Sequence, residues 1–407
     1  MEGSTGRKFN VGGVWLDQPF RIRRLGHFGY NMSDVEQGLA FYRDVIGFQV
    51  SDPLDFAAVL SDPAICDGIK DTTGYFMRHG NDHHSFVVFP RPVMDRLAGG
   101  HAPPEVTVNQ ITWQVGSLRE VGDATDWFDE QKIFMPRRGR DTPGSNWHAY
   151  PIDPEGHTNE LYYGIEQIGW DGLSKPPESK ARGFLEKPDL PQMSEYQEVE
   201  MFRDQGMDLT SGYRHEETEP AIYDVGGVTL ARPYKITRVG PVRLFVDDMD
   251  VMLAYYTDTL GLPITEEVVY DGHRCVFLRA NTDHHSIALY PIALRETLGL
   301  SSHSTCMSFG IQVGGYQQLR DALAYLAGKG VKIKYLPDEL SPGIDYSAYV
   351  VDPDGHLLQF YWYMEQVGWD GRPRPASERR RTVAPWPEAL DPMSDVYGGE
   401  AFLGPLG

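Results

Sequence analysis

The spacing of apolar residues near the start of the chain changes from one regular pattern to another. From Ile22 to Met32 apolar positions alternate with others, which predicts a strand, and from Val35 to Ile46 they follow the spacing of an amphipathic helix. Short strands follow, the last of them at Val87 to Phe89. This order of strand, helix and further strands indicates a βαβββ unit.

The same order is found a second time directly afterwards. The pattern predicts a strand at Val108 to Val115, a helix at Leu118 to Gln131, and strands around His148 to Ile152 and Asn159 to Tyr163. The first part of the chain therefore contains two βαβββ units.

A longer repeat shows that this pair of units is itself duplicated. The segment VGGVWLDQPFRI begins at Val11, and VGGVTLARPYKI begins 214 residues later at Val225. Each copy ends alike, with EQIGWDG from Glu166 and EQVGWDG from Glu365, an offset of 199. The second copy has therefore lost residues in loops, where deletions are tolerated.

The repeat defines the expected architecture. We expect an α+β fold in which four βαβββ units form two modules, each module curling around an open-barrel cleft that could hold a small ligand. A helix is expected within the linker, near Glu195 to Gln205. The expected divisions are an N-terminal module at 11–172, a linker at 173–224, a C-terminal module at 225–371 and a tail at 372–407.

Composition narrows the class of protein. The 407 residues carry 37 Lys and Arg against 58 Asp and Glu, a formal net charge of −21, which disfavours binding to nucleic acid. The N-terminal residues do not resemble a signal peptide, and no stretch of 18 apolar residues suggests a membrane span. Three scattered cysteines do not suggest a disulfide framework. We expect a cytoplasmic protein that acts on small molecules.

The two copies differ at positions that could bind a metal. Residues that serve the shared fold should persist in both copies, whereas residues that serve a single site need persist in only one. In each of three differences the second copy lacks the possible ligand: His27 corresponds to Pro241, Gln110 to Ser308, and Glu160 to Gln359. We therefore expect one active centre, in the N-terminal module.

A divalent metal with an open coordination side suits these residues. Such an ion takes about three protein ligands and leaves positions for substrate, and a neutral imidazole and a carboxylate are suitable donors. His27 lies in one predicted strand and Glu160 in another, so both could point into the same cleft. The alternative, a hydrogen-bonded core histidine and an exposed acid, is disfavoured by the comparison between copies.

The residues alone leave the roles of the other histidines open. The pair His83-His84 persists in the second copy as His284-His285, so its role could be structural or catalytic. His148 is matched by Ser347, and a surface strand position is preferred for it over a position in the site.

Several motifs resemble a known family, the type I extradiol dioxygenases of the vicinal oxygen chelate superfamily, and most of all those that cleave biphenyl-2,3-diol. The motifs are LGHF from Leu25, LAFYRDVIGFQVSD from Leu39, NDHHS from Asn81, the pair Gly139-Arg140, and Y-x2-D-P-x-G-x3-E from Tyr150 to Glu160. The resemblance implies a vicinal oxygen chelate fold for both modules.

The resemblance also implies roles for individual residues. His27 and Glu160 would be metal ligands, His84 the acid/base that handles the catechol proton, and Tyr150 a hydrogen-bonding partner of the bound substrate oxygen. His83 and His148 are not among the residues to which the resemblance gives a role; we keep both as candidate substrate-binding residues, the role each would have if it lies in the site.

Two positions depart from the family pattern. The family's second ligand histidine falls on Gln110, and its histidine after the Gly-Arg pair falls on Asp141, for which we keep a catalytic role. An amide oxygen can bind a metal, as in glyoxalases of the same superfamily, so Gln110 is expected as the third ligand. The alternative is that His83 or His84 completes the set.

The expected activity follows from the resemblance. We expect a dioxygenase that uses Fe(II), with Mn(II) or another divalent metal as the alternative, and that cleaves a small catecholic aromatic substrate with O2. Self-association into a homo-oligomer is also expected. The alternatives are a non-oxidative metal-dependent isomerase, lyase or hydrolase of the superfamily, and a protein that binds an aromatic ligand without turning it over.

Overall fold

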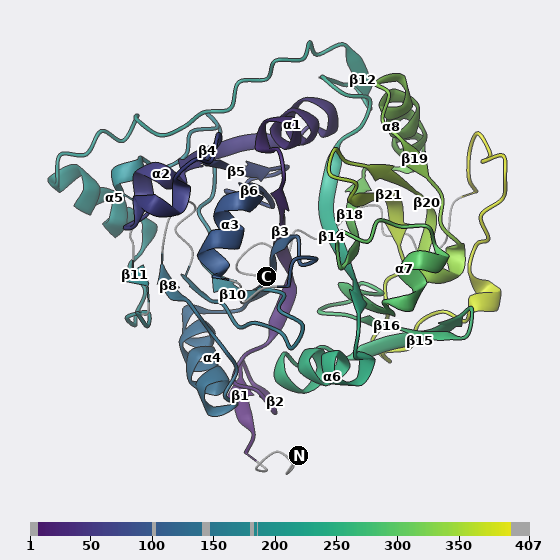
Figure 1. Cartoon of the computed structure of the whole chain (residues 1–407), viewed down its shortest axis with the longest axis horizontal. Helices are drawn as coiled ribbons and strands as arrows, with labels where there is room; N and C mark the ends of the chain where they lie inside the picture. The colour runs from purple at the N-terminus through teal and green to yellow at the C-terminus, as the bar shows by residue number, and fades with distance from the viewer. Residues whose placement is uncertain (1–6, 100–102, 141–146, 180–182, 185, 392–407) are drawn as a thin grey trace. The chain divides into compact units, whose positions relative to one another are not determined.

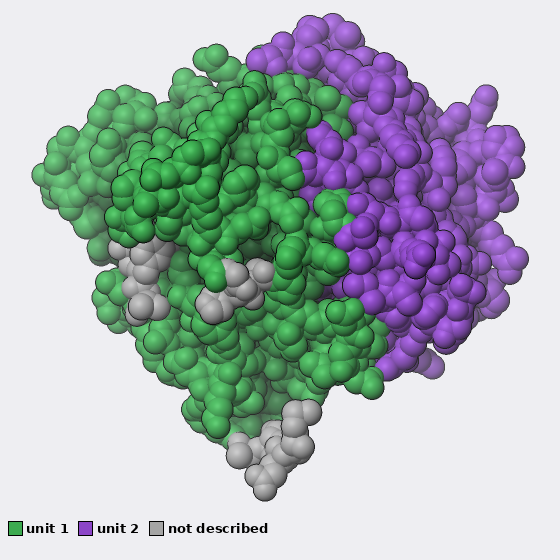
Figure 2. All heavy atoms as spheres, in the orientation of Figure 1, with its two compact units in different colours: residues 1–217, 246–262, 303–305 green, residues 218–245, 263–302, 306–407 purple. Residues whose placement is uncertain are grey.

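The chain forms two compact units in the computed structural model, which describes residues 7–99, 103–140, 147–179, 183–184 and 186–391 (Figure 1). Unit 1 comprises residues 1–217, 246–262 and 303–305, and unit 2 comprises residues 218–245, 263–302 and 306–407 (Figure 2). Each unit is built around one mixed sheet.

In unit 1 the described residues form a nine-stranded sheet with the order β11-β8-β9-β10-β7-β3-β6-β5-β4. Its strands are β3 (Ile22–Met32), β4 (Gln49–Asp55), β5 (Thr73–Arg78), β6 (Phe86–Pro90), β7 (Val108–Val115), β8 (Arg138–Arg140), β9 (Trp147–Ala149), β10 (Asn159–Tyr163) and β11 (Gly183–Phe184). A separate hairpin pairs β1 (Phe9–Val11) with β2 (Val14–Leu16).

Helices connect these strands. They are α1 (Val35–Leu39), η1 (Ala40–Ile46), α2 (Phe56–Val59), η2 (Pro63–Cys66), α3 (Arg91–Ala98), α4 (Leu118–Glu130), η3 (Pro177–Ser179) and α5 (Glu195–Asp204), and unit 1 also contains α6 (Met249–Ala254) and η4 (Tyr255–Thr259). The predicted helix in the linker is confirmed as α5.

Both predicted βαβββ units of the first copy are confirmed. The first consists of β3, the continuous helix α1–η1 and β4 to β6, and the second consists of β7, α4 and β8 to β10. Asp34 begins α1 by accepting a hydrogen bond from the Gln37 amide, and Gly47, at a φ of 99°, follows η1 in a conformation that favours glycine. The first strands of the two units, β3 and β7, pair antiparallel at the centre of the sheet.

The sheet of unit 2 repeats the strand order of the sheet in unit 1, as the duplication predicts. The described residues of unit 2 form an eight-stranded sheet with the order β15-β16-β17-β14-β18-β21-β20-β19. The strands are β14 (Ile236–Val246), β15 (Ile264–Tyr270), β16 (His273–Leu278), β17 (Ile287–Pro291), β18 (Cys306–Val313), β19 (Ile333–Lys334), β20 (Ile344–Val351) and β21 (Leu357–Met364). The other elements are the hairpin of β12 (Tyr223–Val225) and β13 (Val228–Leu230), with α7 (Ala293–Thr297), α8 (Tyr316–Gly328), η5 (Asp338–Leu340) and η6 (Ala376–Glu378).

Two expectations from composition concern the chain as a whole. Cys66, Cys275 and Cys306 are buried free thiols, so the expectation of a fold without a disulfide framework is confirmed. Within the part of the chain that the structure describes, no helix combines the length and apolar character needed to cross a membrane.

Candidate functional site

The candidate site of unit 1 is built on three neighbouring strands. β10 runs parallel to β7 and pairs Glu160 with Thr112, while β3 runs antiparallel on the other side of β7. The Thr112 hydroxyl accepts a hydrogen bond from the amide of His27 at 2.6 Å, which places His27 and Glu160 on either side of Thr112. Residues 133 positions apart in sequence therefore meet on one face of the sheet.

An irregularity in β3 turns His27 toward this face. The register of β3 against β7 shifts between Leu25 and Phe28. A Cβ atom on Gly26 would lie 2.1 Å from the Tyr162 hydroxyl oxygen, so only glycine fits beside this buried ring. The glycine of the Arg-Leu-Gly motif before His27 thus has a steric explanation.

His27 and Glu160 form the centre of the site. Nε2 of His27 lies 2.9 Å from Oε2 of Glu160, and both side chains are buried. Burial acts to raise the pKa of Glu160, but the charge and hydrogen bond of His27, with more distant contributions from His148 and Arg137, lower it below its ordinary value. The carboxylate is therefore negatively charged at neutral pH and attracts a cation.

The geometry of this pair fits a metal ion. Two ligand atoms at about 2.1 Å from an ion and at right angles to each other are about 3.0 Å apart, close to the separation found here. The nitrogen that faces Glu160 is Nε2, while Nδ1, at the other edge of the His27 ring, is buried and has no hydrogen-bond partner among the described residues. The pair thus offers a buried carboxylate and an imidazole nitrogen, which are donors that suit a divalent transition metal.

Gln110, the residue expected as the third ligand, lies on the neighbouring strand β7. Gln110 is buried on β7 two residues before Thr112, so by strand alternation it faces the same side as Glu160. Among the described residues no group of three His, Cys, Asp or Glu side chains is placed to hold an ion. Gln110, whose carboxamide is a donor of another type, lies on the face of the sheet that carries Glu160.

His84 lies beside His27, with 4.2 Å between the two ring centroids. Its Nδ1 is 3.0 Å from Nδ1 of His83, whose Nε2 is 2.7 Å from a carboxylate oxygen of Asp52. If the Nε2 proton of His83 points at Asp52, Nδ1 of His83 accepts the proton of His84 Nδ1. The lone pair of His84 then lies on Nε2, as a base requires.

The His-His arrangement is the same in unit 2. His284 contacts His285 through their Nδ1 atoms at 3.0 Å and contacts Glu266 through Nε2 at 2.9 Å. The pair is therefore a property of the module and does not by itself mark an active centre. Asp52 and Glu266 were missed from the sequence, although the offset of 214 aligns these two carboxylates.

The expectation of a surface position for His148 is wrong. His148 lies on β9 opposite Tyr162 of β10 and is almost fully buried, because β9 is covered on both edges by β8 and β10. Its Nδ1 is 3.8 Å from a carboxylate oxygen of Glu160, and its ring centroid is 4.6 Å from that of Tyr150. The structure therefore brings His148 into the candidate site.

Tyr150 is buried at the end of β9, and the guanidinium of Arg137 lies 4.1 Å from the centroid of its ring. Arg137 was not singled out from the sequence. Asp141, for which a catalytic role was expected, lies outside the described residues.

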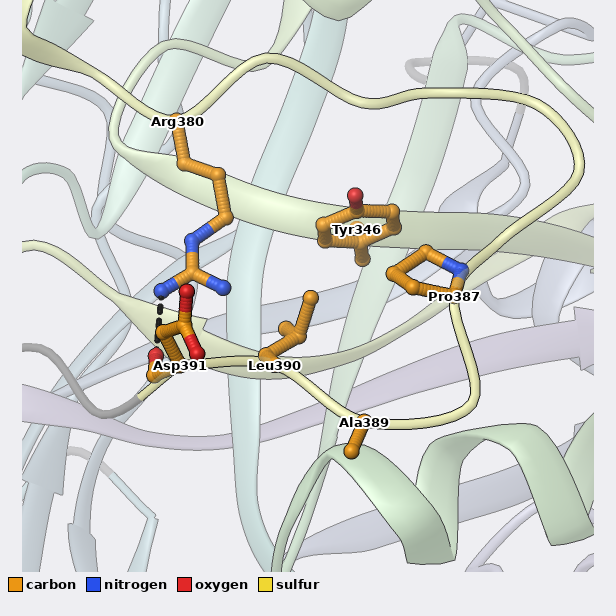
Figure 3. Close-up of a pocket in the computed structure, with 6 residues that line it drawn as sticks. All are labelled: Tyr346, Arg380, Pro387, Ala389, Leu390 and Asp391. Atoms are coloured by element: carbon orange, nitrogen blue, oxygen red, sulfur yellow. Dashed lines mark hydrogen bonds between the residues drawn. The ribbon is translucent and has the colours of Figure 1, made fainter.

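A pocket of about 410 Å³ lies elsewhere, in unit 2 (Figure 3). Tyr346 of β20 and Arg380, Pro387, Ala389, Leu390 and Asp391 line it, and the Arg380 guanidinium donates to the Asp391 carbonyl at 2.7 Å. None of the candidate site residues contributes to this pocket.

The family is established by comparison with known proteins. The Glyoxalase/Bleomycin resistance protein/Dioxygenase superfamily matches residues 24–161 and 238–360, one match in each copy of the repeat. These matches cover more than half of the chain, and the chain therefore belongs to this superfamily.

Curated relatives match a shorter stretch. The chain is 29% identical over 144 residues to 3-methylcatechol 2,3-dioxygenase of Pseudomonas putida, which covers 35% of this chain and 43% of the relative. It is 30% identical over 142 residues to biphenyl-2,3-diol 1,2-dioxygenase of Paraburkholderia xenovorans, covering 34% and 40%. The match thus spans less than half the length of each of these relatives.

Solved structures show the fold over most of the chain. A Mn(II)-bound glyoxalase from Novosphingobium aromaticivorans has a TM-score of 0.53 at 16% identity and covers 86% of this chain and 85% of its own. The 2,3-dioxygenase LapB from Pseudomonas sp. KL28 has a TM-score of 0.54 at 14% identity, covering 86% and 95%. The expectation of tandem vicinal oxygen chelate modules is confirmed.

Proposed function

We propose that this chain is a metal-dependent extradiol-type dioxygenase that cleaves a catecholic aromatic ring with O2 in unit 1. The observation that carries the proposal is the buried pair of His27 and Glu160, which unit 2 replaces with Pro241 and Gln359. The names of the curated relatives, which act on 3-methylcatechol and biphenyl-2,3-diol, support this class of substrate.

The metal would be held by His27, Glu160 and the amide oxygen of Gln110. Fe(II) is the proposed ion, and Mn(II) is the alternative. When bound, the ion would supply positive charge that lowers the pKa of the substrate hydroxyl groups and open positions for substrate and oxygen. The negative charge of Glu160 would offset part of the charge of the ion.

His84 is the proposed base for the substrate hydroxyl proton. Its ring lies against that of His27, and when His83 donates its Nε2 proton to Asp52, the lone pair of His84 lies on Nε2. Both ring nitrogens of His83 contact protein groups, so we assign His83 to positioning His84 instead of contacting the substrate.

Tyr150 and His148 are proposed to contact the substrate. Both are buried, with His148 3.8 Å from Glu160 and Tyr150 against the His148 ring, so their hydrogen bonds to a substrate oxygen would form where water is largely excluded. Arg137, above the Tyr150 ring, adds positive charge at this side of the site.

Oxygen uptake tests the proposal. The full chain is loaded anaerobically with Fe(II), its iron content is measured, and a panel of catechols is added in the presence of O2. Uptake with at least one catechol is expected, with its loss in Glu160→Gln. Gln359→Glu in unit 2 adds the corresponding carboxylate without changing unit 1 and should leave the uptake unchanged. Absence of uptake at full iron occupancy with every catechol would contradict the proposal.

A non-oxidative reaction is the second candidate, and Gln110 favours it. A carboxamide is a weaker donor than the imidazole that the dioxygenase pattern has there, and it suits a metal that polarises a carbonyl without changing oxidation state. Turnover of an α-hydroxycarbonyl or related substrate under argon, at the same rate as in air, would decide for this candidate. If metal analysis of the freshly purified protein found no metal and His27→Ala left the affinity for a catechol unchanged, a binding protein without turnover would replace both.

A further inference from the structure

Unit 2 contains a buried arginine where unit 1 has a glycine. Arg243 of β14 pairs with Ser308 of β18, and Gly29 of β3 pairs with Gln110 of β7, so the two residues occupy the same position in their modules. The side chain of Arg243 is completely buried. A buried guanidinium requires a compensating environment, because removing its charge from water is costly.

The partners of this guanidinium are the counterparts of the site residues of unit 1. Nη1 of Arg243 donates to Oε1 of Gln359 and lies 3.4 Å from the Ser308 hydroxyl. Nη2 lies 3.1 Å from Nε2 of His285. In unit 1 these three positions are occupied by Glu160, Gln110 and His84.

The two modules carry opposite buried charges at corresponding places. Unit 1 has a buried carboxylate, Glu160, and no side chain cation at position 29, whereas unit 2 has a buried cation and the neutral amide of Gln359. Burial is the largest cause that lowers the pKa of His285 well below its ordinary value, and the charge of Arg243 is the second. The His285 ring is therefore neutral, and its Nε2 can accept the hydrogen bond from Arg243.

Space for the arginine comes from a second substitution. A Cβ atom on Gly29 would lie 2.0 Å from Cγ2 of Val87, which pairs with Gly29. The matching registers of β5 with β6 and of β16 with β17 place Ala288 at the position of Val87. Alanine lacks the methyl groups that would obstruct a side chain at this position. The pair Gly29 and Val87 of unit 1 is thus replaced by the pair Arg243 and Ala288 in unit 2.

We propose that Arg243 is a permanent substitute for the metal ion in unit 2, where its guanidinium is held by the positions that would bind and surround the ion in unit 1. Arg243 therefore stabilises unit 2 without a metal and keeps metal out of its cleft. The chain binds one ion, in unit 1. This last statement rests on the proposed function, whereas the role of the guanidinium in unit 2 does not.

Chemical rescue tests the role of the guanidinium. In the full chain, Arg243→Gly should lower the Tm by about 5 °C or more, because three hydrogen-bonding groups lose their partner in a buried site. Ethylguanidinium at low millimolar concentration should restore at least half of the loss, and the neutral isostere ethylurea should not. Arg274→Gly, which removes an exposed arginine of β16, should show no rescue. Equal rescue by ethylurea, or no fall in Tm, would overturn the proposal.

A second pair of variants keeps the proposal testable if Arg243→Gly does not fold. Lysine retains the positive charge and methionine retains a similar volume without it. We expect Arg243→Lys to have a higher Tm than Arg243→Met. A methionine variant as stable as the original chain would show that only volume matters and would overturn the proposal.

Metal counting separates this inference from the proposed function. After anaerobic loading and removal of excess ion, elemental analysis should give one Fe(II) or Mn(II) per chain, with the loss of that ion in Glu160→Gln. Two ions per chain in the original protein would overturn the inference while leaving the proposed function intact. No bound ion would overturn the proposed function and the stoichiometry, and the rescue experiment would still decide the role of Arg243.

Discussion

The Thr112 hydroxyl bonds to both backbone groups of His27: it accepts from the amide at 2.6 Å and donates to the carbonyl at 2.7 Å. These bonds compensate the polar groups that the irregular register of β3 would otherwise leave unpaired. Thr112 thus fixes the backbone from which the proposed ligand His27 extends. The corresponding residue of unit 2 is Gly310, in the module that lacks the histidine.

Removal of the Thr112 hydroxyl should weaken metal binding. Thr112→Val keeps the shape of the side chain but cannot bond to His27, and loss of such an outer contact to a ligand typically costs 10- to 100-fold, roughly, in metal affinity. Titration of metal-free protein with Fe(II) or Mn(II) measures this. Thr72→Val, which removes an exposed hydroxyl that donates to Asp55, is the control. Equal affinity in both variants would show that Thr112 does not position His27.

The two His-His pairs allow a matched test of the proposed base. Asp52→Asn should disturb the orientation of His83 and through it His84, and lower kcat by roughly 10- to 100-fold. It should also shift the pH dependence of kcat, because the proton-accepting nitrogen of His84 is no longer fixed.

The control is Glu266→Gln in unit 2. Contacts with His284 and Arg379 outweigh burial and lower the pKa of Glu266 to about 2, so its loss should reduce the free energy of unfolding. It should leave kcat within about twofold of the original value, because unit 2 is proposed to be inactive. If both variants lost activity to the same extent, the His-His pair would be structural in both units.

Because only glycine fits at position 26, a substitution there should destabilise the protein far more than a substitution of an unhindered glycine. Gly26→Ala places a Cβ atom against the Tyr162 ring and should lower the free energy of unfolding by about 1–3 kcal/mol, with weaker metal binding because His27 follows directly. Gly80→Ala, where a Cβ meets no atom within 4 Å, should be close to neutral. Urea unfolding measures both, and similar stability of the two variants would contradict the packing described for Gly26.

A buried acid in unit 2 makes stability depend on pH. Burial raises the pKa of Asp345 from its ordinary 3.8 to about 6, against the opposing charge of Arg380. The neutral acid is thus favoured by folding, so its contribution is full below pH 3.8 and is lost as the pH rises through 6.

Asp345→Asn keeps this position neutral. The variant should be more stable than the original chain at pH 7 by about 1–3 kcal/mol, and the difference should vanish near pH 3.5, roughly, where the acid is itself protonated. Urea unfolding at the two pH values measures this. A difference that does not change between them would show that the titration of Asp345 is not its cause.

Much of the fold could be predicted because the relevant signals are local. The strands at Ile22–Met32, Val108–Val115 and Asn159–Tyr163 have the predicted bounds, since alternation and capping are properties of neighbouring residues. His148 could not be placed this way, because its burial depends on two other strands covering its own. The interaction of Asp52 with His83 likewise depends on the pairing of strands that are separate in sequence.

By itself the sequence determined the duplication, the four βαβββ units and the loss of His27 and Glu160 equivalents in the second copy. Only the tertiary structure decided what replaced them. The pattern of apolar and polar positions that predicts a strand does not show why Gly29 is replaced by Arg243 in the second copy. The reason lies in the register of β14 against its neighbouring strands, which brings the Arg243 guanidinium into contact with Ser308 and Gln359, 65 and 116 residues away.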